Sequence, residues 1–262
     1  MIGAILGDTL GSRYEFSPAT SYDFELLKIN ADYTDDSVLS IATMDVILNS
    51  KDYQSTYRDY TLKDLRRGYG CHYIQWAESE SLEPYNSFGN GSAMRVSPIG
   101  WVYDNVEDTL SAAKNSAIVT HNHLEGIKGA QAVALAIYMA RTGATKDEIR
   151  SEITSRFEYD LSRTVESIRA SGYKFDVTCQ GSVPESIIAF LDSSDFTSAI
   201  RNAIWLGGDA DTQAAIAGSI AEAYYKKIDT ELLNFVFEKL PQRYGNIVSK
   251  FYNVYGAGVE FI

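Results

Sequence analysis

Small residues recur along the helical segments of this chain, and they constrain how closely its helices must pack. Residues 124–141 include Gly126, Gly129 and several alanines, and residues 211–225 are again rich in alanine and glycine. Glycine costs a helix up to about 1 kcal/mol relative to alanine. Its repetition therefore indicates close contact between helices, and residues 124–141 are predicted to form a central helix with close neighbours.

Apolar residues three or four positions apart predict helices along most of the remaining chain. Such patterns follow Thr34, span residues 110–118, and return in the segments 187–191, 200–205, 232–240 and 247–252. The only fair candidate for a strand is Tyr173–Val177, where side-chain character alternates. We therefore predict an all-α protein of about ten or more helices, forming a single domain over residues 1–262.

Charge and composition exclude several classes of protein. The chain has 35 acidic and 23 basic residues and a net charge of −12, which repels nucleic-acid phosphates and anionic membranes. No apolar run approaches the ~18 residues of a membrane span, and the first residues lack the basic start of a signal peptide. Two cysteines without paired spacing favour free thiols in a reducing compartment. We expect a cytoplasmic protein with no nucleic-acid or membrane partner.

Two acidic segments, more than a hundred residues apart, each open a predicted helix. One is Thr34-Asp35-Asp36-Ser37, and the other is Gly207-Gly208-Asp209-Ala210-Asp211-Thr212. Helix capping explains either segment alone, because acids in a first turn gain ~0.3–1 kcal/mol each from the helix dipole. The duplication favours a cation site where the two segments meet. The paired glycines support it, since they let the backbone bend and approach a ligand.

Four carboxylates that meet repel one another unless cations lie between them. Two divalent ions about 3.5–4 Å apart would balance four or five negative charges and leave open positions for substrate oxygens. Oxygen ligands without histidine or cysteine favour Mg²⁺ or Mn²⁺ over zinc. We therefore expect two Mg²⁺ ions, for which Mn²⁺ can substitute.

Two loops are expected to carry binding residues, because both are dense in polar or turn-forming residues. One begins near Glu15, and the other spans Pro84 to Gly91. In the second loop, Phe88 either stacks on a base or fills the core. From its position alone, His121 favours a capping or core role, and Arg95 either meets a phosphate or forms a buried ion pair.

Five motifs, taken in order, resemble those of the ADP-ribosylglycohydrolase family. They are Gly7-Asp8 with Gly11 and Glu15, Thr34 to Ser37, Gly89-Asn90-Gly91-Ser92-Ala93-Met94-Arg95, Thr120-His121-Asn122-His123, and Gly207 to Thr212. The resemblance runs from residue 3 to about residue 225 and so covers most of the chain. Any one motif is weak, but the set is highly specific.

The resemblance implies an orthogonal all-α bundle with a binuclear Mg²⁺ or Mn²⁺ site. The metal ligands that it implies are Thr34, Asp35, Asp36, Asp209, Asp211 and Thr212. The substrate-binding residues that it implies are Glu15, Ser87, Phe88, Gly89, Asn90, Gly91 and His121. The catalytic residues would be Glu15, Asp36 and Asp209. In such a site the ribose hydroxyls rest on the metals, and the Thr120-His121 pair contacts the diphosphate.

One feature departs from the family pattern. Some members, including dinitrogenase reductase-activating glycohydrolase, carry an acid just before Gly-Asn-Gly that acts as the base. This chain has Asn86-Ser87-Phe88 there, without a carboxylate. The base must therefore be Glu15, a metal ligand or metal-activated water, and the linkage to arginine, serine or another acceptor stays open.

These features predict a Mg²⁺-dependent hydrolase that cleaves the glycosidic bond between ADP-ribose and a modified acceptor. The acceptor would be a protein side chain or a small molecule, so the partner is an ADP-ribosylated protein or an ADP-ribose conjugate. Cleavage at the anomeric carbon passes through an oxocarbenium-like state, which acidic surroundings stabilise. Two alternatives are a catalytically idle ADP-ribose-binding paralogue and a two-metal nucleotide phosphohydrolase.

Overall fold

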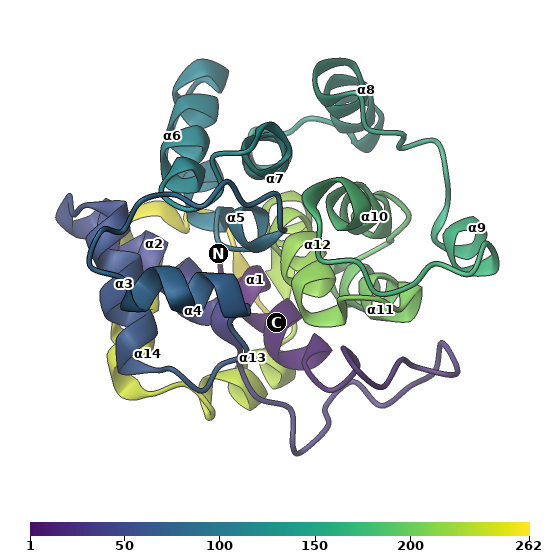
Figure 1. Ribbon diagram of the computed structural model, residues 1–262. Coiled ribbons are helices and arrows are strands. Elements are labelled where there is room, and N and C mark those ends of the chain that lie inside the picture. The colour runs from purple at the N-terminus through teal and green to yellow at the C-terminus, as the bar shows by residue number, and fades with distance from the viewer.

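The structure, a computed structural model, describes residues 1–262 and consists almost entirely of helices (Figure 1). Its helices are α1 (Ile2–Gly11), α2 (Asp35–Asn49), α3 (Tyr53–Lys63), α4 (Cys71–Glu78), α5 (Gly91–Met94), the 3-10 helix η1 (Ser97–Trp101), α6 (Val106–Ile118), α7 (Leu124–Arg141), α8 (Lys146–Phe157), α9 (Val165–Ala170), α10 (Cys179–Leu191), α11 (Phe196–Leu206), α12 (Ala210–Tyr225), α13 (Thr230–Phe237) and α14 (Gln242–Tyr255). The predicted all-α fold of ten or more helices is therefore confirmed.

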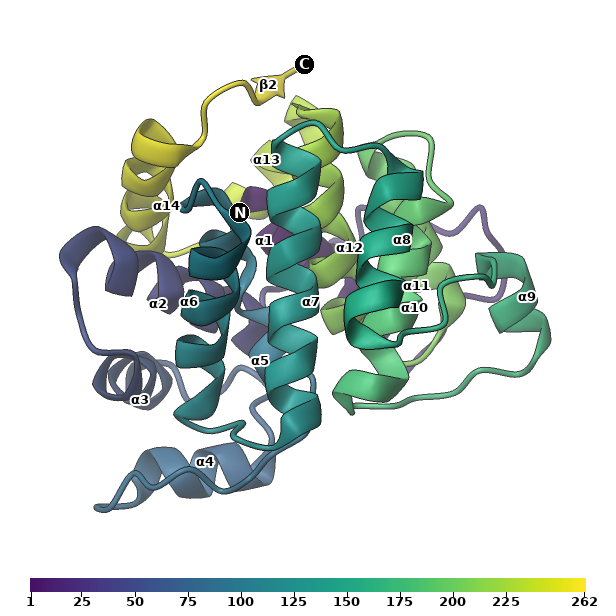
Figure 2. The same ribbon diagram turned by 90° about the horizontal axis from the view of Figure 1, so that it is seen from above.

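Helix α1 is buried along its whole length and packs directly against α12 (Figures 1 and 2). The closest approaches pair Gly3 with Gly218, Gly7 with Ala214, and Gly11 with Ala210. We call these six residues the α1–α12 contact. A Cβ atom added to Gly7 would lie 2.0 Å from the carbonyl oxygen of Ala214. The pairs run in opposite order along the chain, so the two helices are antiparallel and lie nearly backbone to backbone.

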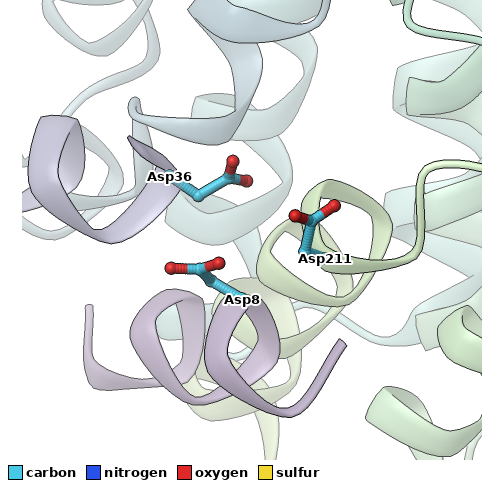
Figure 3. A group of neighbouring side chains, drawn as sticks. All are labelled: Asp8, Asp36 and Asp211. Atoms are coloured by element: carbon cyan, nitrogen blue, oxygen red, sulfur yellow. The ribbon is translucent and has the colours of Figure 1, made fainter. Parts of the chain in front are cut away.

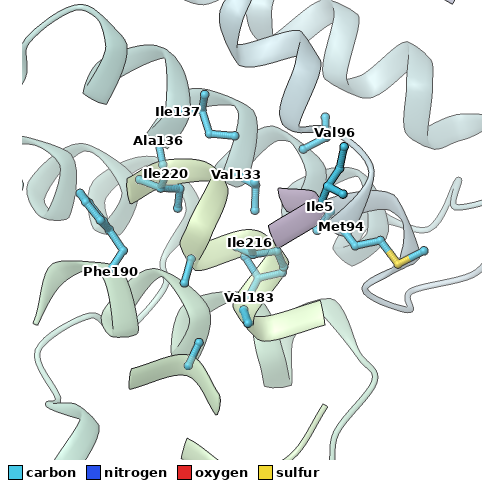
Figure 4. Packing of buried hydrophobic residues seen from close by; sticks show 14 of the residues in the cluster. Ile5, Met94, Val96, Val133, Ala136, Ile137, Val183, Phe190, Ile216 and Ile220 are labelled. Carbon is cyan, nitrogen blue, oxygen red and sulfur yellow. The ribbon is translucent and has the colours of Figure 1, made fainter. Parts of the chain in front are cut away.

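One hydrophobic cluster of 71 buried residues joins helices from both halves of the chain. Figure 4 shows Val133 of α7, Val183 of α10 and Ile216 of α12 within this cluster. Continuous apolar burial of this kind is the main favourable term in folding. It supports the proposal that the chain forms a single domain.

The predicted helices lie where small and apolar residues indicated them. Helix α7 covers residues 124–141 as predicted, and the ring of His123 caps it by accepting a hydrogen bond from the Glu125 amide at 3.1 Å. The close packing predicted from its glycines is also confirmed, because a Cβ on Gly129 would lie 2.4 Å from Sγ of Cys179 on α10.

The strand predicted at Tyr173–Val177 is wrong. The segment is irregular, and only the next residue, Thr178, forms an isolated antiparallel bridge with Gly89. The two strands that do form, β1 (Lys227–Ile228) and β2 (Glu260–Phe261), are a parallel pair of two residues each. A strand of two residues is too short to show the alternation on which sequence prediction depends.

Two expectations from composition can be compared with the structure. Cys71 is exposed and Cys179 is buried, and neither forms a disulfide, as predicted. Among the helices, none has both the length and the apolar character that crossing a bilayer requires.

Candidate functional site

The start of α2 places a hydroxyl and two carboxylates at one wall of a cavity of about 330 Å³. Thr34 has extended backbone (φ −115°, ψ −164°), and its Oγ1 caps the helix by accepting a hydrogen bond from the Asp36 amide at 3.4 Å. Asp36 is buried and Asp35 is partly buried. The threonine therefore performs the capping, while both carboxylates line the cavity.

Asp8 of α1 holds the start of α2 in place. Its carboxylate accepts hydrogen bonds from N and Oγ1 of Thr34 at 2.9 and 2.6 Å, from N of Ser37 at 3.1 Å, and from Oγ of Ser37. Asp8 is fully buried, so these bonds replace the water that the carboxylate loses on folding. Because α1 packs against α12, the same carboxylate fixes the start of α2 relative to α12.

The start of α12 supplies the opposing acids. Gly207 and Gly208 have φ values of +75° and +98°, which favour glycine. A Cβ on Gly208 would also lie 2.8 Å from the ring of Tyr173. Asp209 occupies the N-cap position, but its side chain makes no capping bond and instead accepts a hydrogen bond from Nδ2 of Asn90 at 2.6 Å. The sharp turn therefore directs Asp209 into the cavity rather than toward its own helix.

Carboxylates from three helices converge beside the cavity. Oxygens of Asp8, Asp36 and Asp211 lie within 4.8 Å of one another and face a common space (Figure 3). Oxygens of Glu15, Asp209 and Asp211 form a second group within the same distance. Asp211 belongs to both groups. The acids thus form two adjacent groups that share one carboxylate, and each group could hold a cation.

Burial and mutual repulsion raise the pKa of the carboxyl groups in this cluster. Burial raises the pKa of Asp8 and of Asp209 to about 6, although hydrogen bonds from their neighbours oppose the rise. Burial, and then the charges of Asp211 and Asp8, raise the pKa of Glu15 to about 8. The pKa values of Asp35, Asp36 and Asp211 also lie well above the ordinary value, mainly because these groups are buried and secondly because other carboxylates lie nearby. Near neutral pH the cluster must therefore either hold protons or bind cations.

The cluster fits hard divalent cations. Every acidic member of the two groups offers only oxygen, and neither group contains histidine or cysteine. Oδ1 of Asp36 is buried without a hydrogen-bond partner, although buried carboxylate oxygens ordinarily have one. A cation would supply that missing partner. The donor set therefore suits Mg²⁺ or Mn²⁺ better than zinc.

We expect the cation-free protein to lose stability as the pH rises from about 5 to about 8. The folded pKa values of these acids exceed their unfolded values, so the folded state holds more protons across this range. Raising the pH therefore lowers the free energy of unfolding, and the melting temperature should fall by about 5 °C or more. Differential scanning calorimetry in EDTA measures this fall.

Millimolar Mg²⁺ should reverse the loss, and more strongly near pH 8 than near pH 5, because protons compete with the cation for the carboxylates. A melting temperature that is insensitive both to pH and to the exchange of EDTA for Mg²⁺ would contradict a cation site in this cluster.

The loop from Pro84 to Gly91 forms another wall of the cavity. The segment before α10 holds it through main-chain hydrogen bonds, from Cys179 N to Phe88 O at 2.9 Å and from Asn90 N to Val177 O at 2.8 Å. The main-chain bonds fix the backbone of Asn90. Its side-chain amide is held separately, because it donates a hydrogen bond to Asp209. The loop and the acid cluster are therefore positioned together.

The ring of His121 lies beside this loop. Its Nε2 would be 3.0 Å from a Cβ atom on Gly91, so the ring occupies the space that the missing side chain leaves. His121 is buried and lines the cavity, as the family resemblance implied, whereas the capping role falls to His123.

The cavity brings together nearly all the residues predicted for the site. Its lining includes Glu15, Thr34, Asp35, Asp36, Ser87, Gly89, Asn90, Gly91, His121, Asp209, Asp211 and Thr212. Phe88 lies outside this lining. Its side chain is 45% exposed and its ring centroid lies 5.4 Å from that of His123, so it does not fill the core. Its contact with a base stays a prediction.

Two further residues of the site, Asp8 and Arg95, had no settled role from the sequence. Asp8 belongs to a carboxylate group but was noted only as part of a motif; the available signal was a lone acid in an otherwise apolar segment. Arg95 is completely buried and makes no ion pair, so that alternative is wrong, whereas its contact with a phosphate stays a prediction. Its guanidinium instead lies over the ring of Tyr57, 4.3 Å from the centroid.

Comparisons with known proteins show the family of the chain. A family model described as ADP-ribosylglycohydrolase matches residues 1–256. The chain is 28% identical to ADP-ribosylhydrolase ARH3 of Homo sapiens over 305 residues, covering 86% of this chain and 84% of that protein. It is 26% identical to ADP-ribosylarginine hydrolase Tri1 of Pseudomonas putida over 267 residues, covering 86% of this chain and 69% of that protein.

A solved structure shows a similar fold. A chain described as belonging to an ADP-ribosylglycohydrolase-related protein complex superposes with a TM-score of 0.66 at 23% sequence identity. The match covers 98% of this chain and 93% of that one. At this level of identity the likeness establishes the fold.

Proposed function

This chain belongs to the ADP-ribosylglycohydrolase family, and from that premise we propose that it releases ADP-ribose from a modified side chain or small acceptor with the help of two divalent cations. The family supports hydrolysis of ADP-ribose linkages. The observation that carries the two-cation proposal is Asp211, whose carboxylate belongs to both groups of converging acids.

The cations would be held by the starts of two helices. Thr34, Asp35 and Asp36 lie at the start of α2, and Asp209, Asp211 and Thr212 lie at the start of α12. The hydroxyl of Thr212 already donates to Oδ2 of Asp36 at 3.3 Å, so the two helix starts are in direct contact. When bound, Mg²⁺ or Mn²⁺ would balance the cluster's charge and act as Lewis acids toward oxygens of the ribose and of water.

Glu15 is the carboxylate best placed to accept a proton once bound cations offset the nearby charges, because burial and then the charges of Asp211 and Asp8 otherwise raise its pKa to about 8. It lies at the edge of the cluster, partly buried, and its oxygen is within 4.8 Å of those of Asp209 and Asp211. A water molecule attacking the anomeric carbon would pass a proton to Glu15 while the bond to the acceptor breaks. The leaving acceptor takes up a proton from solvent, and Glu15 afterwards returns its proton to solvent, so that one water molecule is consumed in all. No carboxylate in the Asn86 to Phe88 segment competes for this role.

The remaining walls would hold the rest of the nucleotide. We assign the ribose and diphosphate to the loop from Ser87 to Gly91 and to His121, which line the same cavity as the acids. Asn90 has a second task, because it orients Asp209 through its side-chain amide. A substrate bound along this cavity would reach from the loop to the acid cluster.

The test is release of ADP-ribose from two matched peptides, one modified on serine and one on arginine, in Mg²⁺ and in EDTA. We expect at least one peptide to yield free ADP-ribose and an unmodified side chain in Mg²⁺, with little release in EDTA. Mass spectrometry of both products measures this. The comparison also identifies the linkage, on which the relatives named above differ in their descriptions.

Two other results would each replace the proposal. ADP-ribose binding without release from either peptide would indicate an idle binding protein. Release of phosphate or AMP from ADP-ribose itself, with the glycosidic bond to the peptide intact, would indicate a phosphohydrolase, since two-cation sites also promote phosphoryl transfer.

A further inference from the structure

Arg95 presents a problem that the proposed reaction does not explain. Its side chain is completely buried, makes no ion pair, and leaves Nε and Nη1 without hydrogen-bond partners. Burying an arginine without a charged partner and with unpaired donors is costly. The contacts that it does make are with the ring of Tyr57 and, through Nη2, with the carbonyl oxygen of Ser116 at 3.0 Å and Oγ1 of Thr120 at 2.9 Å.

The bond from Arg95 to Thr120 determines what the threonine hydroxyl can do. A guanidinium only donates hydrogen bonds, so Oγ1 of Thr120 must accept this one. Oγ1 also lies 2.7 Å from Nδ1 of His121, and Thr120 is completely buried. If Nδ1 carried a proton and donated it, the hydroxyl would accept twice and its own hydrogen would have no partner. A buried donor left unpaired costs about 1–3 kcal/mol.

The other arrangement satisfies both the donor and the acceptor of the Thr120 hydroxyl. The Thr120 hydroxyl donates to an unprotonated Nδ1, and the proton of the neutral imidazole then resides on Nε2. A doubly protonated ring is disfavoured, because burial and then the charge of Arg95 hold the pKa of His121 well below its ordinary value. Besides Arg95, the titratable group facing the ring is Tyr85, whose ring centroid lies 6.1 Å away.

We propose that Arg95 is a positioning residue that acts through Thr120 to fix His121 as its Nε2–H tautomer, a neutral hydrogen-bond donor toward an anionic oxygen of the ligand. Nε2 has no hydrogen-bond partner in the chain and lies at the cavity beside the loop of Gly89 and Gly91. The tautomer follows from the network alone. The identity of the acceptor, a phosphate oxygen of the nucleotide, rests on the proposed function.

The tautomer can be tested without any substrate. The chain contains three histidines, so long-range ¹H–¹⁵N spectra of the imidazoles are simple, and a His121→Gln variant assigns the signals of His121. In the ligand-free wild type we expect the ¹⁵N shift of an unprotonated Nδ1 and a protonated Nε2 across neutral pH. A protonated Nδ1, or an imidazolium, in the wild type would overturn the proposal.

Variants at Thr120 test the route from Arg95, because an Arg95 variant can fail to fold. Thr120→Val keeps the shape but removes the hydroxyl, and we expect the two tautomers to mix; Thr120→Ser keeps the hydroxyl and should restore the wild-type pattern. Calorimetric titration with ADP-ribose should show about tenfold weaker binding for Thr120→Val than for Thr120→Ser. An unchanged spectrum in Thr120→Val would overturn the role of Arg95 and Thr120.

The two proposals fail separately. A wild type with the expected tautomer that does not bind ADP-ribose would remove the proposed function and leave the tautomer assignment standing. Normal ADP-ribose release by a protein whose His121 has the opposite tautomer would remove the tautomer assignment and leave the proposed function standing.

Discussion

Replacing Asp211 by asparagine is expected to lower turnover about a thousand-fold or more while leaving the helices folded. Asp211 is the carboxylate common to both acid groups, so the change removes a negative ligand from two adjacent cation sites at once. The amide keeps the size of the side chain but neither its charge nor its second acceptor oxygen. Steady-state release of ADP-ribose from the better of the two peptides measures the loss.

The same substitution, although it lowers turnover, should stabilise the cation-free protein. Burial and the neighbouring acids Asp209 and Asp8 raise the pKa of Asp211, so an uncharged residue relieves repulsion in the cation-free protein. Its melting temperature in EDTA near pH 8 should rise, and the increment from Mg²⁺ should shrink. Asp104→Asn is the matched control, because that side chain is 95% exposed. Equal turnover in Asp211→Asn and Asp104→Asn would end the two-cation mechanism.

The Gly7→Ala substitution is expected to destabilise the protein by about 3 kcal/mol, a large effect for a single methyl group. The new Cβ would lie 2.0 Å from the carbonyl oxygen of Ala214 and 2.5 Å from the Ala215 amide nitrogen. Both atoms belong to the backbone of a buried helix, which cannot move aside as a flexible side chain can. The strain must separate α1 from α12. Urea unfolding, monitored by circular dichroism, measures the change.

Gly245→Ala is the matched control for this prediction. Gly245 lies in α14, and a Cβ there would meet nothing within 4 Å. The same change in composition should therefore stabilise the protein by about 0.5–1 kcal/mol through helix propensity. If both variants shift stability in the same direction, steric contact between α1 and α12 is not what requires glycine at position 7.

Much of the fold could be predicted because its helices carry local signals. Helix α7 is marked by small residues over its whole length, and α2 begins at a threonine that caps it. Helix α1 gives no such signal: all of its residues are buried, so it lacks the polar face from which amphipathic helices are predicted. Residues 173–177 alternate in side-chain character like a strand, but they form an irregular connection. Alternation alone cannot distinguish a strand from such a connection.

The candidate site could be predicted to a similar extent. The acids at the starts of α2 and α12 are recognisable because the two members of each pair lie within three residues and follow a turn or cap. Asp8 could not be given its role, because its four hydrogen bonds come from residues that lie far along the chain. The partners of Arg95 are equally non-local, so the charge on that residue suggested an ion pair that does not exist.

The α1–α12 contact also has a consequence for the order of events during synthesis. Helix α1 is synthesised about two hundred residues before α12, the helix of residues 210–225 that covers its glycine face. Until those residues emerge, the apolar surface of α1 has no native partner, and the early chain depends on other contacts or on chaperones to avoid aggregation. Asp8 and Asp211 likewise cannot meet until the start of α12 has been made. The proposed cation sites can therefore form only after synthesis has passed residue 212.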